Sequence, residues 1–163
     1  MVKIKLAFIT DLQHIISVAD ATWKQTYAPI ISREQIEYMY ERNYTAEALR
    51  EQMQDGTTFL LATEAGQAIG FAAYSLREDG IVIIPKLYVM PEVQRKSIGK
   101  LLLGEIERVG VKNKCSYIEL NVNRKNSAIY FYKKMGFELY EKADIAYGKF
   151  WLNDYVLRKK ISQ

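Results

Sequence analysis

The chain of 163 residues has a single cysteine, Cys115, and a single histidine, His14. A disulfide within the chain is therefore impossible, and a zinc site built from cysteine and histidine is excluded in practice. Cys115 opens an apolar run, so we expect a buried or half-buried thiol and not a nucleophile. A catalytic triad would have to use His14, which stands early in a helical pattern where a surface or packing role is expected. No cluster of metal ligands is apparent, so no metal is expected.

Long hydrophobic runs are also missing. No apolar stretch approaches the roughly 20 residues that a membrane span needs. The N-terminal segment reaches an acidic residue at Asp11 and has no small-residue cleavage site, unlike a signal peptide. Apolar residues make up 49% and charged residues 26%, as in ordinary globular proteins. We therefore expect a cytoplasmic protein without a membrane partner, formed by one domain over residues 1–163.

The net charge of +4 is too small to indicate nucleic-acid binding by itself. It is unevenly distributed, because residues 32–55 carry a net charge of −3 and the rest of the chain carries +7. An acidic arm on a basic body fits two partners of opposite charge, although a solvated helical face would give the same pattern. The basic residues 158–160 are best explained as a solvated C-terminal end, and no recognition helix is apparent.

Periodicity and turn residues predict the order of elements. A strand over 3–9 is followed by three helices, which Asp11, Ser32 and Thr45 would cap at their N-termini. The remaining predicted elements are strands over 58–63, 68–76 and 81–90, a helix over 97–113, a strand over 117–122, a helix over 126–135 ended by Gly136, and strands over 137–146 and 150–157. The three middle strands form an antiparallel meander, and the helix after them implies a parallel pairing through a right-handed crossover. The sequence thus predicts an α+β fold, with a mixed, mostly antiparallel central sheet and helices on both faces.

Residues 87–100 are the most informative segment. A buried strand ends at Pro91, a short basic loop follows, and an amphipathic helix begins. The free N–H groups at a helix N-terminus favour an anion through hydrogen bonds and the helix dipole. Three side chains add positive charge: Arg95, Lys96 and Lys100. Because Gly99 lets the backbone approach closely, a pyrophosphate is the natural ligand.

The residues Gln94, Ser97 and Gly99 form the pattern Gln-x-x-Ser-x-Gly, which resembles the acetyl-CoA signature of the GCN5-related N-acetyltransferase (GNAT) family, Gln/Arg-x-x-Gly-x-Gly/Ala. The preceding Leu-Tyr-Val-x-Pro is also similar to that family. Ser97 stands where glycine is usual, so we expect weakened but retained binding, with a difficulty if this position needs a positive φ. The chain has neither a P-loop nor a dinucleotide glycine motif.

A second segment, residues 126–137, resembles the second GNAT signature, Asn-x-x-Ala-x-x-Phe-Tyr-x-Lys-x-Gly-Phe, with Ala128 one place early. Two motifs in the right order imply the GNAT fold and acetyl-CoA as cosubstrate, without a metal. The expected cofactor-binding residues are Leu87, Tyr88, Val89, Gln94, Arg95, Lys96, Ser97, Ile98, Gly99, Lys100 and Asn126. In the family, the strand carrying Tyr88 and Val89 holds the thioester, and its N–H groups stabilise the oxyanion. Asn126 also fits a plain helix N-cap.

The resemblance implies a general acid at Tyr132, whose phenol would protonate the leaving thiolate. From spacing alone, Tyr132 could equally be a packing residue on an apolar helix face. The base is less well defined, because residues 81–90 contain no acid. Glu119 on the partner strand is the best candidate, against an ordinary solvent-facing role or a water chain to bulk solvent.

The acceptor end resembles a subgroup that includes bacterial spermidine/spermine acetyltransferases, through residues 21–27 and 32–39. Aromatic faces and carboxylates suit a flexible polycation. The expected acceptor-binding residues are Trp23, Tyr27, Glu34 and Tyr38, with Glu37 and Glu41 nearby. The pairs Glu34/Tyr38 and Tyr40/Tyr44 could instead simply stabilise a helix.

The resulting hypothesis is acetyl transfer to a small-molecule primary amine, by direct attack in a ternary complex. A polyamine such as spermidine or spermine is the expected acceptor. The alternatives are a non-catalytic acyl-CoA-binding module, an acetyltransferase for a protein amino group and, less well supported, a DNA-binding regulator. No nucleic-acid or membrane partner is expected, and a homodimer is possible.

Overall fold

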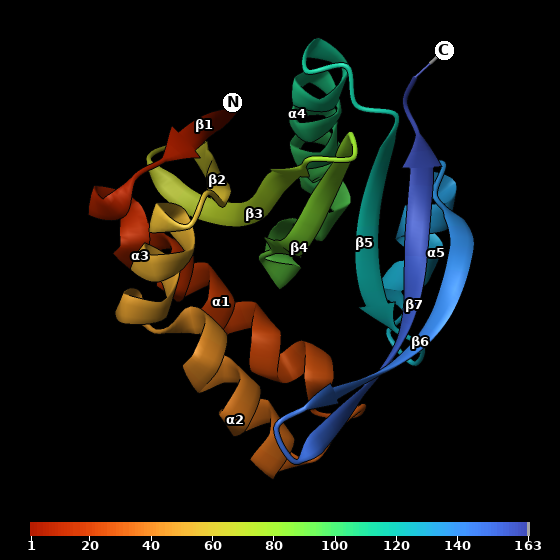
Figure 1. Cartoon of the computed structure of the whole chain (residues 1–163). Helices are drawn as coiled ribbons and strands as arrows, with labels where there is room; N and C mark the ends of the chain where they lie inside the picture. Colours follow the sequence, from red (N-terminus) through yellow and green to blue (C-terminus); the bar gives the residue numbers. More distant parts are fainter. Residues whose placement is uncertain (163) are drawn as a thin grey trace. The chain divides into compact units, whose positions relative to one another are not determined.

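The computed structural model describes residues 1–162, without the side chains of residues 94–96. Five α-helices lie in this part of the chain: α1 (Leu12–Tyr27), α2 (Arg33–Tyr44), α3 (Ala46–Gln54), α4 (Ile98–Lys112) and α5 (Ala128–Lys134) (Figure 1). Two short 3-10 helices cover Ile9–Asp11 and Pro91–Lys96. None of the described helices combines the length and the apolar character needed to cross a membrane.

The strands are β1 (Val2–Ala7), β2 (Thr58–Glu64), β3 (Gln67–Arg77), β4 (Ile81–Val89), β5 (Tyr117–Asn123), β6 (Glu138–Tyr147) and β7 (Phe150–Lys160). Hydrogen bonding orders them β1-β2-β3-β4-β5-β7-β6. β4 and β5 are parallel, whereas β1 with β2, β2 with β3, β5 with β7 and β6 with β7 are antiparallel. The prediction of a mixed, mostly antiparallel sheet with one parallel pairing is confirmed.

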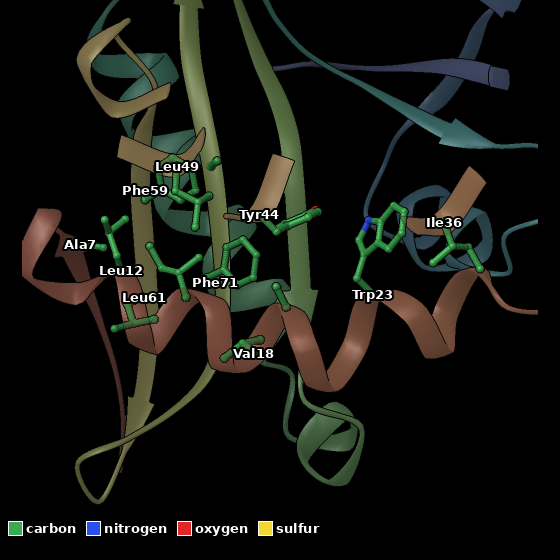
Figure 2. Packing of buried hydrophobic residues seen from close by; sticks show 13 residues of the cluster. Ala7, Leu12, Val18, Trp23, Ile36, Tyr44, Leu49, Phe59, Leu61 and Phe71 are labelled. Atoms are coloured by element: carbon green, nitrogen blue, oxygen red, sulfur yellow. The ribbon is translucent and has the colours of Figure 1, made fainter. Parts of the chain in front are cut away.

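The chain divides into two compact units, one of residues 1–75 with 86–105 and one of residues 76–85 with 106 onward. The first unit contains α1 to α3 and β1 to β3, around a continuous hydrophobic core. Its fully buried side chains include Ile15, Leu49, Phe59, Leu61 and Phe71. Figure 2 shows Leu12 and Val18 of α1 together with Leu49 of α3 and the strand residues Phe59, Leu61 and Phe71, so helix and strand side chains fill one core. The second unit is built on β5, β7 and β6 with α5.

Two of the three predicted helix caps are confirmed. The Ser32 Oγ accepts a hydrogen bond from the Gln35 N–H at 3.1 Å, and the Thr45 Oγ1 accepts one from the Ala48 N–H at 3.1 Å. Asp11 occupies the predicted N-cap position of α1, but its side chain makes no cap bond to the helix and instead accepts the Phe8 N–H at 2.9 Å. That hydrogen bond also lowers the pKa of the Asp11 carboxyl.

The structure also decides three further expectations, on Gly136, Cys115 and the segment before α4. Gly136 follows α5 with a φ of +99°, the left-handed conformation that ends helices. Cys115 is buried, as its apolar surroundings predicted. The segment before α4 is not the predicted loop, because Pro91–Lys96 forms a 3-10 helix with proline in its first turn.

Candidate active site

The turn into α4 has an unusual backbone conformation at Ser97, which has φ +60° and ψ 29°, in the left-handed region. In this region the Cβ of an L-residue causes steric strain that glycine avoids. The positive φ explains why the resembled signature has glycine at this position. Ser97 therefore has the backbone strain that we expected for a residue other than glycine. Immediately afterwards α4 begins at Ile98, and the Leu101 N–H donates to the Ser97 carbonyl at 3.1 Å.

The first amides of α4, at residues 98–100, lack intrahelical acceptors by the geometry of any helix start. These are the N–H groups that we expect to bind an anion, and Lys100 is exposed next to them. The side chains of Gln94, Arg95 and Lys96 lie outside the described residues. Pyrophosphate binding at this turn stays a prediction, as do the roles of Ser97, Ile98 and Gly99 in it.

Replacing Ser97 with glycine is expected to leave CoA affinity equal or improved. It should also raise the free energy of unfolding by up to about 1 kcal/mol, because relief of a left-handed strain of about 1–2 kcal/mol exceeds the entropic cost of glycine. Calorimetric titration with CoA and urea unfolding measure the two effects. Ala65→Gly is the matched control, since Ala65 has φ +51° in the β2–β3 turn and its replacement should change stability alone. A large loss of CoA affinity in Ser97→Gly would identify the serine hydroxyl as a ligand.

The end of β4 lies very close to β3. A methyl group placed on Gly70 would meet the Tyr88 carbonyl oxygen at 3.1 Å, Ile98 Cγ2 at 3.3 Å and Val89 Cα at 3.5 Å. The Met90 N–H also donates to the Ile69 carbonyl at 2.8 Å. A side chain at position 70 would therefore press on the backbone at Tyr88 and Val89, which glycine avoids. This is the stretch, with Leu87, that we expect to hold the thioester.

Tyr132 and Asn126 belong to α5 and the turn before it. Tyr132 is buried, and its ring lies 5.4 Å from the ring of Phe131 and 5.7 Å from that of Phe137, centroid to centroid. These contacts fix the orientation of the ring. The Asn126 Oδ1 accepts the Ala128 N–H at 2.9 Å, so this side chain supports the start of α5. The proton-donor role of Tyr132 and the cofactor contact of Asn126 stay predictions.

Glu119 is held between two guanidinium groups. Its carboxylate accepts from Arg158 Nε at 2.9 Å and from Arg77 Nη1 at 3.4 Å. Arg158 also stacks on the ring of Tyr140, with 3.6 Å between its guanidinium carbon and the ring centroid. The Glu119 carboxylate is therefore already engaged in ion pairs with two arginines. The base role assigned to Glu119 stays a prediction, and its ion pairs count against it.

The second unit contains a carboxyl group that the sequence did not single out, that of Asp154 on β7. It is buried, and burial raises its pKa, although a hydrogen bond with Asn121 and the charge of Arg124 act in the opposite direction. Asp154 pairs with Asn123 in the strand register. The sequence signal was absent, because Asp154 follows Asn153 as part of a polar pair between two apolar runs, and nothing there marks its burial.

An aromatic cluster from four elements lies in the first unit. We use this name for Trp23, Tyr27, Tyr40, Tyr44, Phe71 and Tyr88. The ring centroid of Trp23 is 4.8 Å from that of Tyr27 and 5.8 Å from that of Tyr44. Figure 2 shows the indole of Trp23 rising from α1 and the hydroxyl end of Tyr44 pointing toward it. The predicted residues Trp23 and Tyr27 are thus brought together next to Tyr88.

Tyr88 links the aromatic cluster to β4. Its ring centroid lies 6.3 Å from that of Tyr44 and 5.8 Å from that of Phe71. Burial raises the pKa of the Tyr88 phenol well above its usual value, and hydrogen bonds with Tyr27 and Tyr44 act in the same direction. Tyr88 is therefore a neutral hydrogen-bonding group on the strand that is expected to hold the thioester.

The other two predicted acceptor residues lie elsewhere on α2. Glu34 is exposed in the first turn, and Tyr38 is stacked against Arg42, whose guanidinium carbon is 4.3 Å from the ring centroid. Neither belongs to the aromatic cluster. The cluster instead contains Tyr40 and Tyr44, which the sequence had marked only as an i,i+4 pair. That spacing was the available signal for them.

Lys86 was also missed. This β4 residue is 6% exposed, and its Nζ lies 4.8 Å from the ring centroid of Tyr44. Burial lowers the pKa of its ammonium group from 10.5 to about 8. A lysine in an apolar strand was the only sequence signal. No group of three or more potential metal ligands occurs among the residues that the structure describes.

Comparison with known proteins places this geometry in context. Residues 27–151 match the family model of an acetyltransferase (GNAT) domain. The spermidine N(1)-acetyltransferase of Thermoplasma acidophilum is 34% identical to the chain, and the alignment covers 98% of this chain and 97% of the relative. An uncharacterised N-acetyltransferase of Mycobacterium bovis is 25% identical over 94% of this chain and 99% of its own.

Solved structures give the same result. The PaiA N-acetyltransferase of Thermoplasma acidophilum, in complex with coenzyme A, superposes with a TM-score of 0.84 at 32% identity, covering 98% of this chain and 99% of that one. A GCN5-related N-acetyltransferase of Rhodopseudomonas palustris has a TM-score of 0.81 at 21% identity, with 97% and 94% of the two chains covered. At that lower identity the similarity concerns the fold alone.

Proposed function

Because this chain belongs to the GCN5-related N-acetyltransferase family, we propose that it transfers the acetyl group of acetyl-CoA to a polyamine such as spermidine or spermine. The family membership makes the chain an acetyl-CoA-dependent N-acetyltransferase. The acceptor is the part that is proposed. It rests on the aromatic cluster beside β4, and on the 34% identity to a spermidine acetyltransferase.

The aromatic cluster supports this acceptor through its chemistry. Aromatic faces attract alkylammonium groups, and the cluster already holds two: the Nζ of Lys24 lies 5.2 Å from the ring centroid of Tyr40, and that of Lys86 lies 4.8 Å from that of Tyr44. Asp20 adds a carboxylate at the cluster, where it accepts a hydrogen bond from the Tyr40 hydroxyl. Acidic side chains of α2 carry further negative charge, which would attract the distal ammonium groups of a polyamine.

In the proposed reaction, α4, β4 and Tyr132 each have one task. The pyrophosphate binds the first amides of α4, and the pantetheine and thioester lie along β4 at residues 87–89. The acceptor nitrogen attacks the acetyl carbon directly, and backbone N–H groups of β4 stabilise the oxyanion. Tyr132 protonates the thiolate that leaves. Direct attack requires both substrates to be bound at once, so a ternary complex is expected.

The test is CoA release from acetyl-CoA with a panel of amines. We expect spermidine and spermine to give the highest kcat/KM, above a monoamine of similar length, free lysine and a peptide with a free N-terminus. Mass spectrometry of the product identifies the acetylated nitrogen. A peptide as best acceptor would support the alternative of a protein acetyltransferase. CoA binding without release for any amine would support a non-catalytic acyl-CoA-binding module.

A further inference from the structure

Lys86 is a buried cation without an opposite charge. No described side chain forms an ion pair with it, and its polar interaction is the one with the ring of Tyr44. Burying an ammonium group in this way is unfavourable, and an apolar residue of similar length would avoid the cost. A buried lysine without a counter-charge in a candidate active site is better explained by a functional role than by a structural one.

The surroundings of Lys86 are aromatic and uncharged. The titratable groups next to it are Tyr44 from α2, Tyr88 two residues along β4 and Tyr27 from α1, which is hydrogen-bonded to Tyr88. β3 contributes Phe71, which does not titrate. Two charged residues contact the aromatic cluster at Tyr40, namely Lys24 and Asp20.

The position of Lys86 in the chain is as relevant as its burial. It directly precedes residues 87–89, where we expect the thioester. Successive strand residues rise about 3.3 Å and alternate faces, so Lys86 and Tyr88 share a face of β4. An acceptor amine that approaches the thioester along the aromatic cluster would therefore meet the Lys86 amine.

We propose that Lys86, in its neutral form, accepts the proton that the acceptor ammonium must lose before it attacks the acetyl group. This inference rests on the proposed function. The acceptor N–H bond breaks, its proton passes to Lys86 Nζ, and the freed lone pair forms the bond to the acetyl carbon. The C–S bond then breaks, and the thiolate gains a proton while the new amide nitrogen loses its extra one. The proton on Lys86 is finally released to solvent, which balances the reaction.

Two physical features suit Lys86 to this task. A general base works best when its pKa is near the operating pH, and the pKa of about 8 satisfies this condition. Two ammonium groups in one apolar site repel each other. The state in which only one of the two amines, the acceptor or Lys86, is protonated is therefore favoured over the state in which both are. Glu119, in contrast, is already paired with two arginines.

The experiment measures kcat/KM for the best amine acceptor against pH, at saturating acetyl-CoA. The kcat/KM of the wild type should rise with pH and level off with an apparent pKa near 8. Lys86→Met should be slower by about 10²-fold at pH 8, the lower range for loss of general base assistance, and should lack this inflection. Lys86→Arg should be equally impaired, because a guanidinium stays protonated. Lys112→Met removes an exposed ammonium in the last turn of α4, outside the aromatic cluster, and should keep the wild-type profile.

Stability supplies a readout that does not depend on activity. Because the pKa of Lys86 is about 8 in the folded chain and 10.5 unfolded, the unfolded chain binds more protons between these values. Wild-type stability should therefore gain a contribution as pH rises from 8 to 10.5, and Lys86→Met should lack it and be more stable at pH 7. Urea unfolding at several pH values measures this and shows that the variant folds.

The outcomes separate the two proposals. An inflection near pH 8 that persists in Lys86→Met, or full activity in Lys86→Arg, would overturn the proton-acceptor role. If the wild type prefers an amine other than a polyamine, the proposed acceptor fails, and the Lys86 test proceeds with that amine. A loss confined to acceptors that carry a carboxylate would also overturn the inference, since Lys86 would then bind an anion. If no amine is acetylated, both proposals fail.

Discussion

Replacing Tyr132 with phenylalanine should lower kcat by about 10²–10⁴-fold while CoA affinity changes little, because general acid assistance is of this size. The substitution removes one hydroxyl and keeps the ring, so the contacts with Phe131 and Phe137 should survive. A loss in kcat and in kcat/KM by the same factor would place the effect in the chemical step. Steady-state rates with the best amine, under conditions where chemistry limits the rate, measure it.

Tyr130→Phe is the matched control for this prediction. Tyr130 lies two residues earlier on the same helix, and its side chain is exposed, so loss of its hydroxyl should leave the rate unchanged. A Tyr132→Phe rate within twofold of the wild type would make Tyr132 a packing residue. The thiolate would then be protonated by solvent.

Gly70→Ala should impair both stability and acetyl-CoA use. The added methyl group would press on the Tyr88 carbonyl at 3.1 Å, and backbone atoms cannot rotate away as a side chain can. Overpacking of this kind costs about 1–3 kcal/mol of unfolding free energy. Because β4 must shift, and with it the expected thioester site, kcat/KM for acetyl-CoA should also fall by about tenfold or more. Urea unfolding and initial rates against acetyl-CoA concentration measure the two effects.

Gly104→Ala provides the comparison on α4, where an added methyl group would meet no atom within 4 Å. This change should stabilise the chain by up to about 1 kcal/mol, since alanine favours the helix, and it should leave the kinetics unchanged. Wild-type acetyl-CoA kinetics in Gly70→Ala would show that the position of β4 at Tyr88 does not control thioester binding. Unchanged stability in that variant would show that β3 and β4 can move apart without cost.

The sequence alone determined the order of the elements, the mixed sheet and the family. These depend on local signals: the caps at Ser32 and Thr45, the hairpin residues between β2 and β3, and two motifs whose residues lie within a few positions of each other. Such signals act over one or two turns of chain, so neighbouring residues suffice to recognise them. The 3-10 helix before α4 and the bond from Asp11 to Phe8 were not recognised, because several local hydrogen-bonding patterns were available to the same residues.

Only the tertiary structure decided which side chains meet. Tyr44 and Lys86 are more than forty positions apart, and they meet because the C-terminal end of α2 contacts β4 through Tyr44. Glu119 looked like a free acid in the sequence, but Arg158, brought beside it by the pairing of β5 with β7, neutralises it. Likewise, the sequence showed that Ser97 stands where the family has glycine, but only the structure showed its positive φ. Burial and charge pairing depend on all the elements that surround a residue, and they set the chemistry of a lysine, a phenol or a carboxylate.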